Sequence, residues 1–289
     1  MQTSKNEDNI ILTIIIVSYE RTKDLDECIQ SIYKYNDLKQ NLEIIVVDHS
    51  PSESLYNFIE RTYRNKQNFK IIKHENKGFG SGNNYGASFA KGKYLLFLNP
   101  DTVLIEPIFL SVINSFYEDT GMIGVKLLNN QLHANKSFDW VDKFGFFTNQ
   151  YMKYCNIKNI FDEKNMYTEG ADIFIKKDVF AKVKQFDEKL FMYFEEPDLV
   201  HRLHEFGYKN MFIKECHIIH KEGRSFGESE FTIREKIKSQ IYYSHKYKID
   251  YKRKLRYEKI LFRILSLISK SQRKSCLLHI GLLNEYLEK

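Results

Sequence analysis

The sequence predicts an α/β fold, in which a Rossmann-like, mostly parallel central sheet is flanked by helices and followed by a helical C-terminal extension. Two observations predict the sheet. Continuous apolar runs rich in β-branched residues, at 10–18 and 42–48, are typical of strands buried on both faces. Between such runs apolar residues recur at helical spacing, and strands that alternate with helices form parallel sheets. A length of 289 residues suits one large domain or two smaller ones.

The expected elements follow in order through the first hundred residues. After the strand at 10–18, apolar residues from Leu25 to Tyr33 recur at helical spacing, so a helix leads to the strand at 42–48. The next elements are a helix at 53–64, a strand at 69–73, a helix at 83–90 and a strand at 94–98. In such sheets the loops at the carboxyl ends of the strands carry the ligand site.

The pattern is looser after residue 101. We expect a helix from Pro107, a strand at 122–126, an irregular stretch to about residue 167, a strand at 171–176, and helices from Asp178 and Pro197. The irregular stretch is rich in aromatic residues, which pack a core or line a binding cleft, and the core is the favoured interpretation. These aromatic residues are Phe138, Trp140, Phe144, Phe146, Phe147, Tyr151 and Tyr154.

Composition and charge exclude several classes of protein. Hydrophobic residues make up 43% and charged residues 28%, so a disordered chain, a collagen-like fibre and a coiled coil are poor descriptions. The net charge of +6 is uneven, because residues 234–274 hold 14 Lys or Arg against three acids, while the remainder is mildly acidic. This distribution argues against nucleic acid as a partner and favours a local anionic partner such as a membrane face.

Cysteine usage and the N-terminal residues indicate a cytoplasmic protein. The four cysteines are far apart and form no Cys-x-x-Cys pair, which favours free thiols in a reducing compartment. Residues 1–9 hold two acids and no apolar run, and the run at 10–17 is too short to span a bilayer.

A glycine-rich segment, ENKGFGSGNNYG, lies between a predicted strand and a predicted helix. Its glycines permit close approach of the backbone to a ligand, and a helix N-terminus favours phosphate. A dinucleotide-binding fold is the alternative, but its Gly-x-Gly-x-x-Gly fingerprint requires a glycine where Asn83 stands, and this segment follows the third strand. Asp101 lies at a suitable distance to act as the ribose-binding acid, so that alternative stays open.

Three further groups of residues carry chemistry. Asp101 follows a buried strand and Pro100 stiffens its turn, so its carboxylate is a loop cap, a ribose acceptor or a metal ligand. Glu195 and Glu196 stand at a helix entrance among aromatic residues, where they either complement the helix dipole or, with a raised pKa, act as general base. His220, in the apolar run CHIIH, is a structural residue or a metal ligand.

The motifs of the chain, in their order and spacing over residues 10–225, resemble those of family 2 glycosyltransferases of the GT-A fold, especially the rhamnosyltransferase-like branch. They are VSYERTKDLDECIQSI, LEIIVVDHSPSES, ENKGFGSGNNYG, KYLLFLNPDT, GADIFIKKDVF, FDEKLFMYFEEPDL and IIHKEGRS. The resemblance implies an inverting, metal-dependent transferase that moves a sugar from a nucleoside-diphosphate donor to a saccharide or lipid-linked acceptor in cell-surface polysaccharide synthesis. It favours dTDP-rhamnose as donor, and a UDP-linked sugar would use much the same cleft.

The resemblance also implies roles for individual residues. Asp101, in Asn99-Pro100-Asp101, would be the main carboxylate ligand of Mg²⁺ or Mn²⁺, His220 would supply a further ligand, and Arg224 would assist the phosphates. The donor would lie against Val17, Ser18, Tyr19, Glu20, Asp48, Asn76, Lys77, Gly78, Gly82, Asn83, Asn99, Asp101 and Arg224.

The sequence departs from the pattern of the family at two positions. The base of the family is usually the aspartate of a Glu-Asp pair, which matches Glu196 here, so the acceptor sits further out, Glu195 shares the role, or activity is low. His49 stands where the family commonly has asparagine. The competing functions are a catalytically weak nucleotide- or sugar-binding protein and, less favoured, an NAD-type oxidoreductase.

We expect a catalytic domain at residues 1–228 and a basic helical extension at 229–289. In the extension, apolar residues from Ile260 to Ile268 interleave with Lys259, Arg263 and Lys270. Such a basic amphipathic helix lies on an anionic membrane surface, packs its apolar face on the catalytic domain, or forms a homodimer. The first alternative makes the protein peripheral on the inner face of the cytoplasmic membrane.

Overall fold

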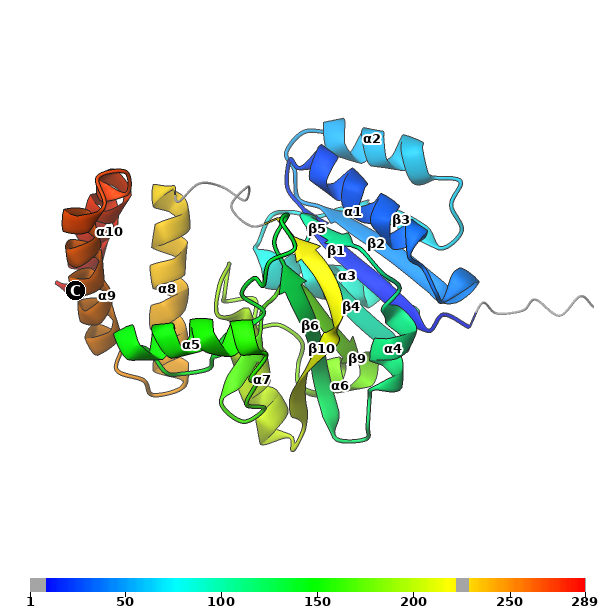
Figure 1. The fold of residues 1–289 in the computed structure, drawn as a ribbon. Helices are drawn as coiled ribbons and strands as arrows, with labels where there is room; N and C mark the ends of the chain where they lie inside the picture. The colour runs from blue at the N-terminus through cyan, green and yellow to red at the C-terminus, as the bar shows by residue number, and fades with distance from the viewer. Residues whose placement is uncertain (1–8, 222–228, 289) are drawn as a thin grey trace, which may run out of the picture.

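A computed structural model describes residues 9–221 and 229–288. Its centre is an eight-stranded sheet of order β3-β2-β1-β4-β9-β6-β10-β5, with a separate two-stranded sheet, β7-β8 (Figure 1). The strands of the large sheet are β1 (Leu12–Ser18), β2 (Leu42–Asp48), β3 (Phe69–Lys73), β4 (Tyr94–Leu98), β5 (Thr102–Leu104), β6 (Thr120–Leu128), β9 (Asp172–Lys176) and β10 (Lys209–His220). The small sheet pairs β7 (Phe138–Trp140) with β8 (Met166–Thr168).

The predicted strands are present, and β2, β3 and β4 span the predicted residues. Strands β1 to β4 are parallel neighbours, and β6 runs parallel to β10. The sheet is nevertheless mixed, because β9 runs antiparallel to both β4 and β6, and β5 runs antiparallel to β10. The expected mostly parallel order therefore holds best in the N-terminal half.

Helices cover both faces of the large sheet, as predicted. They are α1 (Thr22–Lys34), α2 (Ser54–Tyr63), α3 (Phe79–Phe89), α4 (Phe109–Asn114), α6 (Lys177–Lys182) and α7 (Glu195–Glu205), with a short 3₁₀ turn, η1 (Lys39–Asn41). Buried residues of α1, α2 and α4 form one core with the sheet, and those of α3, α6 and α7 form another. Helix α3 begins at Phe79, four residues before the expected start, because the glycine-rich segment is itself helical.

The stretch up to residue 167 was expected to be irregular, and this expectation is wrong. It contains β7 and a helix of 13 residues, α5 (Phe146–Lys158). The aromatic residues there divide between the two roles considered. Phe138 is buried with Met152, Cys155 and Met166, whereas Tyr151 and Tyr154 are half exposed. Helix α5 has no continuous apolar face, so its periodicity gives a weak signal.

The C-terminal residues form three helices with a core of their own. These are α8 (Glu230–Lys246), α9 (Tyr251–Ile268) and α10 (Arg273–Leu287), which stand side by side away from the large sheet (Figure 1). Their core is built from Ile233, Ile237, Leu255, Leu282 and Leu283. None of the helices in the described ranges is long and apolar enough to cross a bilayer. The four cysteines are buried free thiols, as predicted.

Candidate active site

The carboxyl ends of β1 and β2 lie side by side and bring the first predicted donor residues together. Ser18 and Asp48 are partners in the parallel register, and the Ser18 carbonyl accepts a hydrogen bond of 2.9 Å from the His49 amide. Asp48 is fully buried, and its carboxylate accepts hydrogen bonds from the Ser50 amide at 2.8 Å and from Lys73 Nζ at 3.2 Å. This carboxylate is therefore fixed in direction at the edge of the sheet.

Glycines allow α3 to approach this edge closely. A Cβ on Gly82 would stand 2.6 Å from the His49 ring and 2.9 Å from Val17, so only glycine fits where the helix meets the two strand ends. Gly78 has a φ of +103°, and a Cβ there would stand 2.1 Å from the Phe191 carbonyl oxygen. The loop therefore also contacts the segment that leads to Glu195.

Some of the predicted donor residues make other contacts. The side-chain amide of Asn83 donates to the Phe79 carbonyl within α3 at 3.0 Å, and Asn76 accepts from the Gly78 amide at 3.3 Å. Lys77 forms an exposed ion pair of 2.9 Å with Glu75. These contacts order the loop, and Gly82 packs against Val17 and the His49 ring at the ends of β1 and β2.

His49 belongs to an aromatic cluster beside Asp48. Its Nε2 lies 3.3 Å from Nδ1 of His74, whose ring stacks on Tyr85 with centroids 4.3 Å apart. Burial, together with the neighbouring His74, lowers the pKa of His49 to about 4. The side chain that replaces the family's asparagine is therefore a neutral imidazole at neutral pH.

The two predicted metal ligands lie together. The β5–β10 ladder pairs Thr102 with His220, which places His220 Nε2 3.4 Å from Asp101 Oδ1. Arg21, at the start of α1, approaches the other oxygen of Asp101 at 3.5 Å. Asp101 is only 2% exposed. Sequence reasoning selected the neighbouring Glu20 and missed Arg21, although both stand in the loop after the first strand.

The donor set fits a divalent cation that shares its coordination with a ligand. One carboxylate and one imidazole are suitable donors for Mn²⁺, and a carboxylate suits Mg²⁺. Within residues 9–221 and 229–288, no group of three or more His, Cys, Asp or Glu side chains is arranged to hold a metal. Diphosphate oxygens and water would supply the remaining ligands, as is usual for Mg²⁺. Arg224 lies outside the described residues, as does the expected domain boundary at 228.

The two glutamates at the start of α7 occupy different environments. Tyr193 and Phe194 precede them in the left-handed backbone conformation and turn the chain into the helix. Glu195 is 2% exposed, and burial and the adjacent Glu196 hold its pKa well above the usual range. Glu196 lines a cavity, and burial and the charge of Glu169 raise its pKa to about 7. Of these two glutamates, Glu196 is the one that lines the cavity and can contact a ligand there. With a pKa of about 7, its carboxyl is about half ionised at neutral pH.

Glu196 is connected to the Asp101 turn through a short backbone segment. A Cβ on Gly170 would stand 2.3 Å from Glu196 Oε1, so the carboxyl packs directly on this glycine. The next residue, Ala171, accepts a hydrogen bond of 3.0 Å from the Asn99 amide. Residues 170–171 thus join the turn that carries Asp101 to the carboxylate expected to act as base.

The cavity at Glu196 has a volume of about 440 Å³, which is in the range of small-molecule sites. One side comes from β7, β8 and the start of α7, and the other comes from α8, α9 and α10. Its aromatic lining consists of Trp140, Phe144, Tyr167, Tyr193, Phe194, Tyr257 and Phe262. The sequence interpretation gave the C-terminal helices no part in the site, because only the tertiary structure brings them to Glu196.

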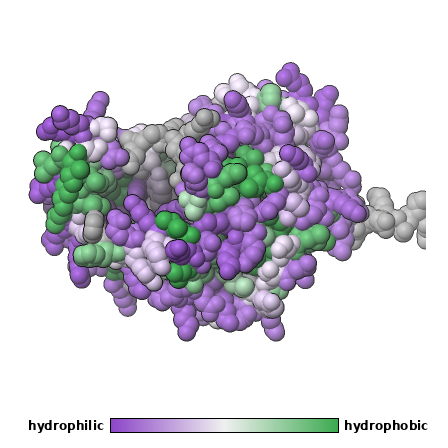
Figure 2. All heavy atoms as spheres, viewed as in Figure 1, coloured by the Kyte–Doolittle hydropathy of each residue, from purple (hydrophilic) through white to green (hydrophobic). Residues whose placement is uncertain are grey.

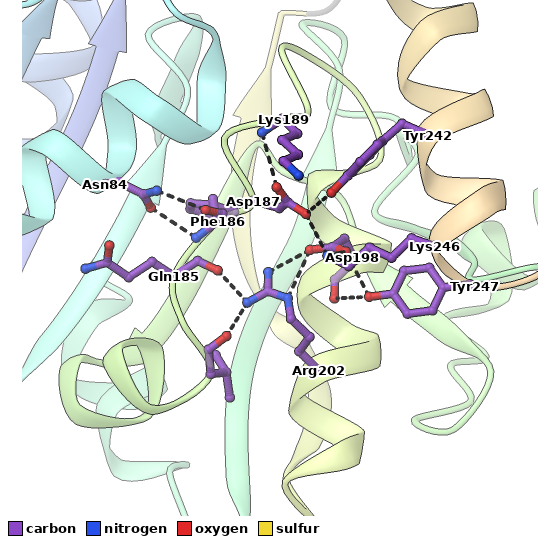
Figure 3. A network of polar contacts seen from close by, with 11 residues as sticks. Asn84, Gln185, Phe186, Asp187, Lys189, Asp198, Arg202, Tyr242, Lys246 and Tyr247 are labelled. Carbon is purple, nitrogen blue, oxygen red and sulfur yellow. Dashed lines mark hydrogen bonds and ion pairs between the residues drawn. The ribbon is translucent and has the colours of Figure 1, made fainter.

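A polar network fastens the C-terminal helices to the helix that carries Glu196 (Figure 3). Asp198 is fully buried in α7. Its Oδ1 forms an ion pair of 2.5 Å with Lys246 Nζ and accepts a hydrogen bond of 2.8 Å from the Tyr247 hydroxyl, both at the end of α8. Arg202 binds the other oxygen of Asp198 at 2.7 Å. Asp187 accepts hydrogen bonds from Tyr242 at 2.8 Å and from Lys246 at 2.7 Å. Asp198 therefore links α7 directly to the end of α8.

Comparison with known proteins gives a family match over most of the core. The family model described as Glycosyl transferase family 2 matches residues 13–182. Minor teichoic acid biosynthesis protein GgaB of Bacillus subtilis (strain 168) is 28% identical over 195 residues, which are 62% of this chain and 19% of GgaB. Rhamnosyltransferase WbbL of Escherichia coli (strain K12) is 25% identical over 232 residues, which are 65% of this chain and 87% of WbbL. The chain thus spans about a fifth of GgaB and most of WbbL.

Solved structures share the architecture. The mannosyltransferase PcManGT from Pyrobaculum calidifontis, in complex with GDP-Man and Mn²⁺, superimposes with a TM-score of 0.59 at 12% identity, over 81% of this chain and 64% of that chain. S. aureus TarS 1–349 in complex with UDP gives a TM-score of 0.52 at 16% identity, over 80% of this chain and 66% of that chain. These likenesses show the fold, and the predicted GT-A architecture is confirmed.

Proposed function

The chain belongs to glycosyltransferase family 2, and from this membership we propose that it is an inverting enzyme that uses Glu196 as its general base. The observation that carries the proposal is the position of Glu196. Its carboxyl packs on Gly170, lines the cavity and has a pKa of about 7. A base whose pKa lies near the working pH combines a large ionised fraction with a useful proton affinity.

The donor would lie across the carboxyl ends of β1, β2 and β4. The close packing of Gly82 against Val17 and His49 supports a nucleotide site there, beside the buried Asp48. A divalent cation held by Asp101 and His220 would neutralise negative charge on the diphosphate, and it would thereby stabilise the nucleoside diphosphate as the leaving group. Arg21 would add a fixed positive charge on the same side.

The chemical step follows from these positions. An acceptor hydroxyl in the cavity would lose its proton to a carboxylate oxygen of Glu196 as its oxygen bonds to the anomeric carbon of the donor. The bond from that carbon to the diphosphate oxygen breaks, and the electron pair leaves with the nucleoside diphosphate. Since the two bonds lie on opposite faces of the sugar, the anomeric configuration inverts. Glu195 is buried away from the cavity and would position the start of α7.

The proposed pathway class is cell-surface polysaccharide synthesis, with a dTDP- or UDP-linked sugar as donor. The similarity to GgaB and WbbL, whose names state teichoic acid biosynthesis and rhamnosyl transfer, supports this class. The branch-level resemblance supports rhamnose as the sugar. The Mn²⁺ and nucleotide bound to structural neighbours are consistent with a metal-dependent donor site.

The outer face of α9 supports placement of the enzyme on the inner face of the cytoplasmic membrane. Ile260, Ile264, Leu267 and Ile268 recur at helical spacing and are 48–83% exposed, and apolar residues gather over this end of the molecule (Figure 2). Arg256 and Arg263 each lie one turn before an exposed apolar residue. Such a face binds anionic lipid. Co-sedimentation with anionic vesicles at low salt tests this placement, and a concentration-dependent dimer without vesicle binding would favour the homodimer instead.

Thermal stabilisation by a panel of nucleoside diphosphates, with and without Mn²⁺, tests the donor site. A ligand that binds only the folded state adds about 2.7 kcal/mol at one hundred times its dissociation constant, so the shift is measurable. We expect a metal-dependent shift with dTDP or UDP that is lost in Asp101→Ala. Stabilisation by NAD alone would contradict the proposal, and nucleotide binding without turnover of any sugar donor would identify a binding protein.

A further inference from the structure

The cavity at Glu196 contains cationic and hydrogen-bond-donating groups whose protein partners are missing among the described residues. Lys254, from α9, lies with its Nζ 4.8 Å from the centroid of the Phe194 ring and 6.0 Å from that of Phe144. Within the described parts of the chain, no carboxylate lies within 4 Å of this ammonium group. Glu258, one turn further along α9, is the carboxylate with the largest electrostatic effect on it.

Three neutral hydrogen-bond donors in the lining of this cavity also lack a partner among the described residues. Trp140 Nε1, Gln240 Nε2 and the Tyr257 hydroxyl are buried atoms without a hydrogen-bond partner in the structure. Gln240 is only 1% exposed. Buried polar groups in native proteins are nearly always hydrogen-bonded, so a cluster of unsatisfied groups around one cavity calls for a ligand. Each of the three can donate a hydrogen bond, and the indole nitrogen can only donate.

Two of the carboxylates that line the cavity, those of Asp139 and Glu169, are already paired with a lysine. Lys136 forms ion pairs of 2.7 Å with both Asp139 and Glu169, so one positive charge is shared between two carboxylates and a negative charge remains beside Glu196. Lys236, from α8, lies 5.6 Å from the centroid of the Tyr193 ring and adds a second cation on the side of the C-terminal helices. The cavity therefore has a catalytic side at Glu196 and a donor-rich side formed largely by α8 and α9.

We propose that the acceptor carries a phosphate group, bound by Lys254 together with Trp140, Gln240 and Tyr257. The inference rests on the proposed function, since it places the acceptor in the cavity of Glu196. A phosphate oxygen accepts hydrogen bonds and does not donate them, which matches a lining of ammonium, indole, amide and hydroxyl donors. A neutral sugar would bring hydroxyl donors and would place no anion in direct contact with the ammonium group of Lys254.

The buried environment of Lys254 also favours an anionic ligand. Burial lowers the pKa of this lysine, because the surrounding aromatic rings replace water around its charge. A phosphate would restore the lost stabilisation through a charge-assisted hydrogen bond. The phosphate belongs either to a phosphodiester-linked polyol chain or to the diphosphate of a lipid-linked saccharide, and the chemistry of recognition is shared by the two.

The single tryptophan of the chain makes a direct experiment available, because Trp140 lines the cavity. The intrinsic fluorescence of the whole protein is titrated with an oligomer of glycerol phosphate, with a short-chain lipid diphosphate sugar, and with glycerol as the neutral probe. Each titration is run with and without saturating nucleoside diphosphate and Mg²⁺, so that binding of a probe in the donor site is recognised by its competition. The variants are Lys254→Met and, as the matched control on the same helix outside the cavity, Lys259→Met.

We expect a saturable fluorescence change with one of the phosphate probes, and the probe that binds identifies the source of the phosphate. Lys254→Met weakens this binding at least tenfold, Lys259→Met leaves it within twofold, and glycerol gives no saturable change. Equal binding by Lys254→Met, tight binding of glycerol, or no response to either phosphate probe would overturn the inference. Because Lys254 lies outside the donor site, all variants keep the thermal shift with nucleoside diphosphate. Loss of that shift from the unmodified protein would instead count against the proposed function.

Discussion

Glu196 Oε1 packs so closely on Gly170 that a side chain at position 170 would collide with it. A Cβ on Gly170 would stand 2.3 Å from this oxygen and 3.0 Å from the carboxyl carbon. Glu196 has one methylene more than the aspartate usual at this position, and the missing side chain at Gly170 provides space for its carboxyl. The position of this carboxyl therefore depends on glycine at position 170.

The substitution Gly170→Ala displaces the Glu196 carboxyl. Misplacement of a reacting group by about 1 Å lowers rates about one hundredfold, and we expect a loss of this size in kcat. Nucleoside diphosphate binding, measured by thermal shift, stays unchanged. The matched control is Gly281→Ala in α10, where an added Cβ meets nothing within 4 Å. Equal kcat for Gly170→Ala and Gly281→Ala would show that Glu196 does not act from its observed position.

The rate of transfer depends on pH through Glu196. Burial and Glu169 raise the pKa of Glu196 to about 7, and only the ionised form accepts a proton, so the rate rises with pH up to about 7 and then levels. Glu196→Gln lowers the rate about 10² to 10⁴-fold. Glu196→Asp keeps the pH dependence at a lower rate, because it retains a carboxylate. A profile that stays flat through pH 7 in the unmodified enzyme would exclude Glu196 as base.

The junction between α7 and α8 contributes strongly to stability. Asp198 is fully buried and holds Arg202 and Lys246 by short ion pairs. In Asp198→Ala, Arg202 loses its paired carboxylate, and Lys246 keeps only its contact with Asp187. Breaking a buried pair in this way costs about 3 to 5 kcal/mol in the free energy of unfolding, measured by urea denaturation. The control is Glu285→Gln, which breaks the largely exposed pair with Arg234 and costs about 1 kcal/mol or less. Similar losses for the two variants would argue against the network.

Asp172 makes the stability of the protein depend on pH. Its carboxyl is 1% exposed, accepts a hydrogen bond of 2.7 Å from the Val125 amide, and has a pKa well above the usual range because of burial. The folded protein therefore keeps this proton at pH values where the unfolded chain, with a pKa of about 4, has released it. Unfolding thus releases a proton, and stability falls as pH rises above about 4 until the folded pKa is passed.

Asp172→Asn removes this dependence and keeps the acceptor oxygen for Val125. The free energy of unfolding of the variant, relative to the unmodified protein, should increase by about 1.4 kcal/mol per pH unit from about pH 5 upward. Urea denaturation at several pH values measures the difference. Parallel pH dependences of the two proteins would mean that Asp172 is ionised in the fold.

The sequence predicts the sheet well because its signal is local. The runs at 42–48, 69–73 and 94–98 each form a strand of that length, and the two that are predominantly apolar, LEIIVVD and YLLFL, are buried throughout. Helix α5 escapes prediction, because exposed aromatic residues and the buried Asn156 blur its apolar periodicity. The early start of α3 escapes it for a related reason, since its glycines are typical of loops and are used here for close packing.

The site is predictable only in part for a different reason. Asp101 and His220 stand more than a hundred residues apart in the sequence, and their motifs suggested that both bind the metal. The distance of 3.4 Å between Asp101 Oδ1 and His220 Nε2 is consistent with that role. Arg21, Gly170 and Lys254 have no such signal, because each acquires its importance from a tertiary neighbour. The acceptor side of the cavity, built by helices outside the matched residues 13–182, depends wholly on how those helices dock.

The most direct test of the account measures release of nucleoside diphosphate from dTDP- and UDP-linked sugars, with Mn²⁺ and a phosphate-bearing acceptor, by the unmodified enzyme and Glu196→Gln. The account predicts release coupled to formation of an inverted glycoside, a loss of about 10² to 10⁴-fold in Glu196→Gln, and equal donor binding by the two proteins. Undiminished release and product formation by Glu196→Gln would contradict it.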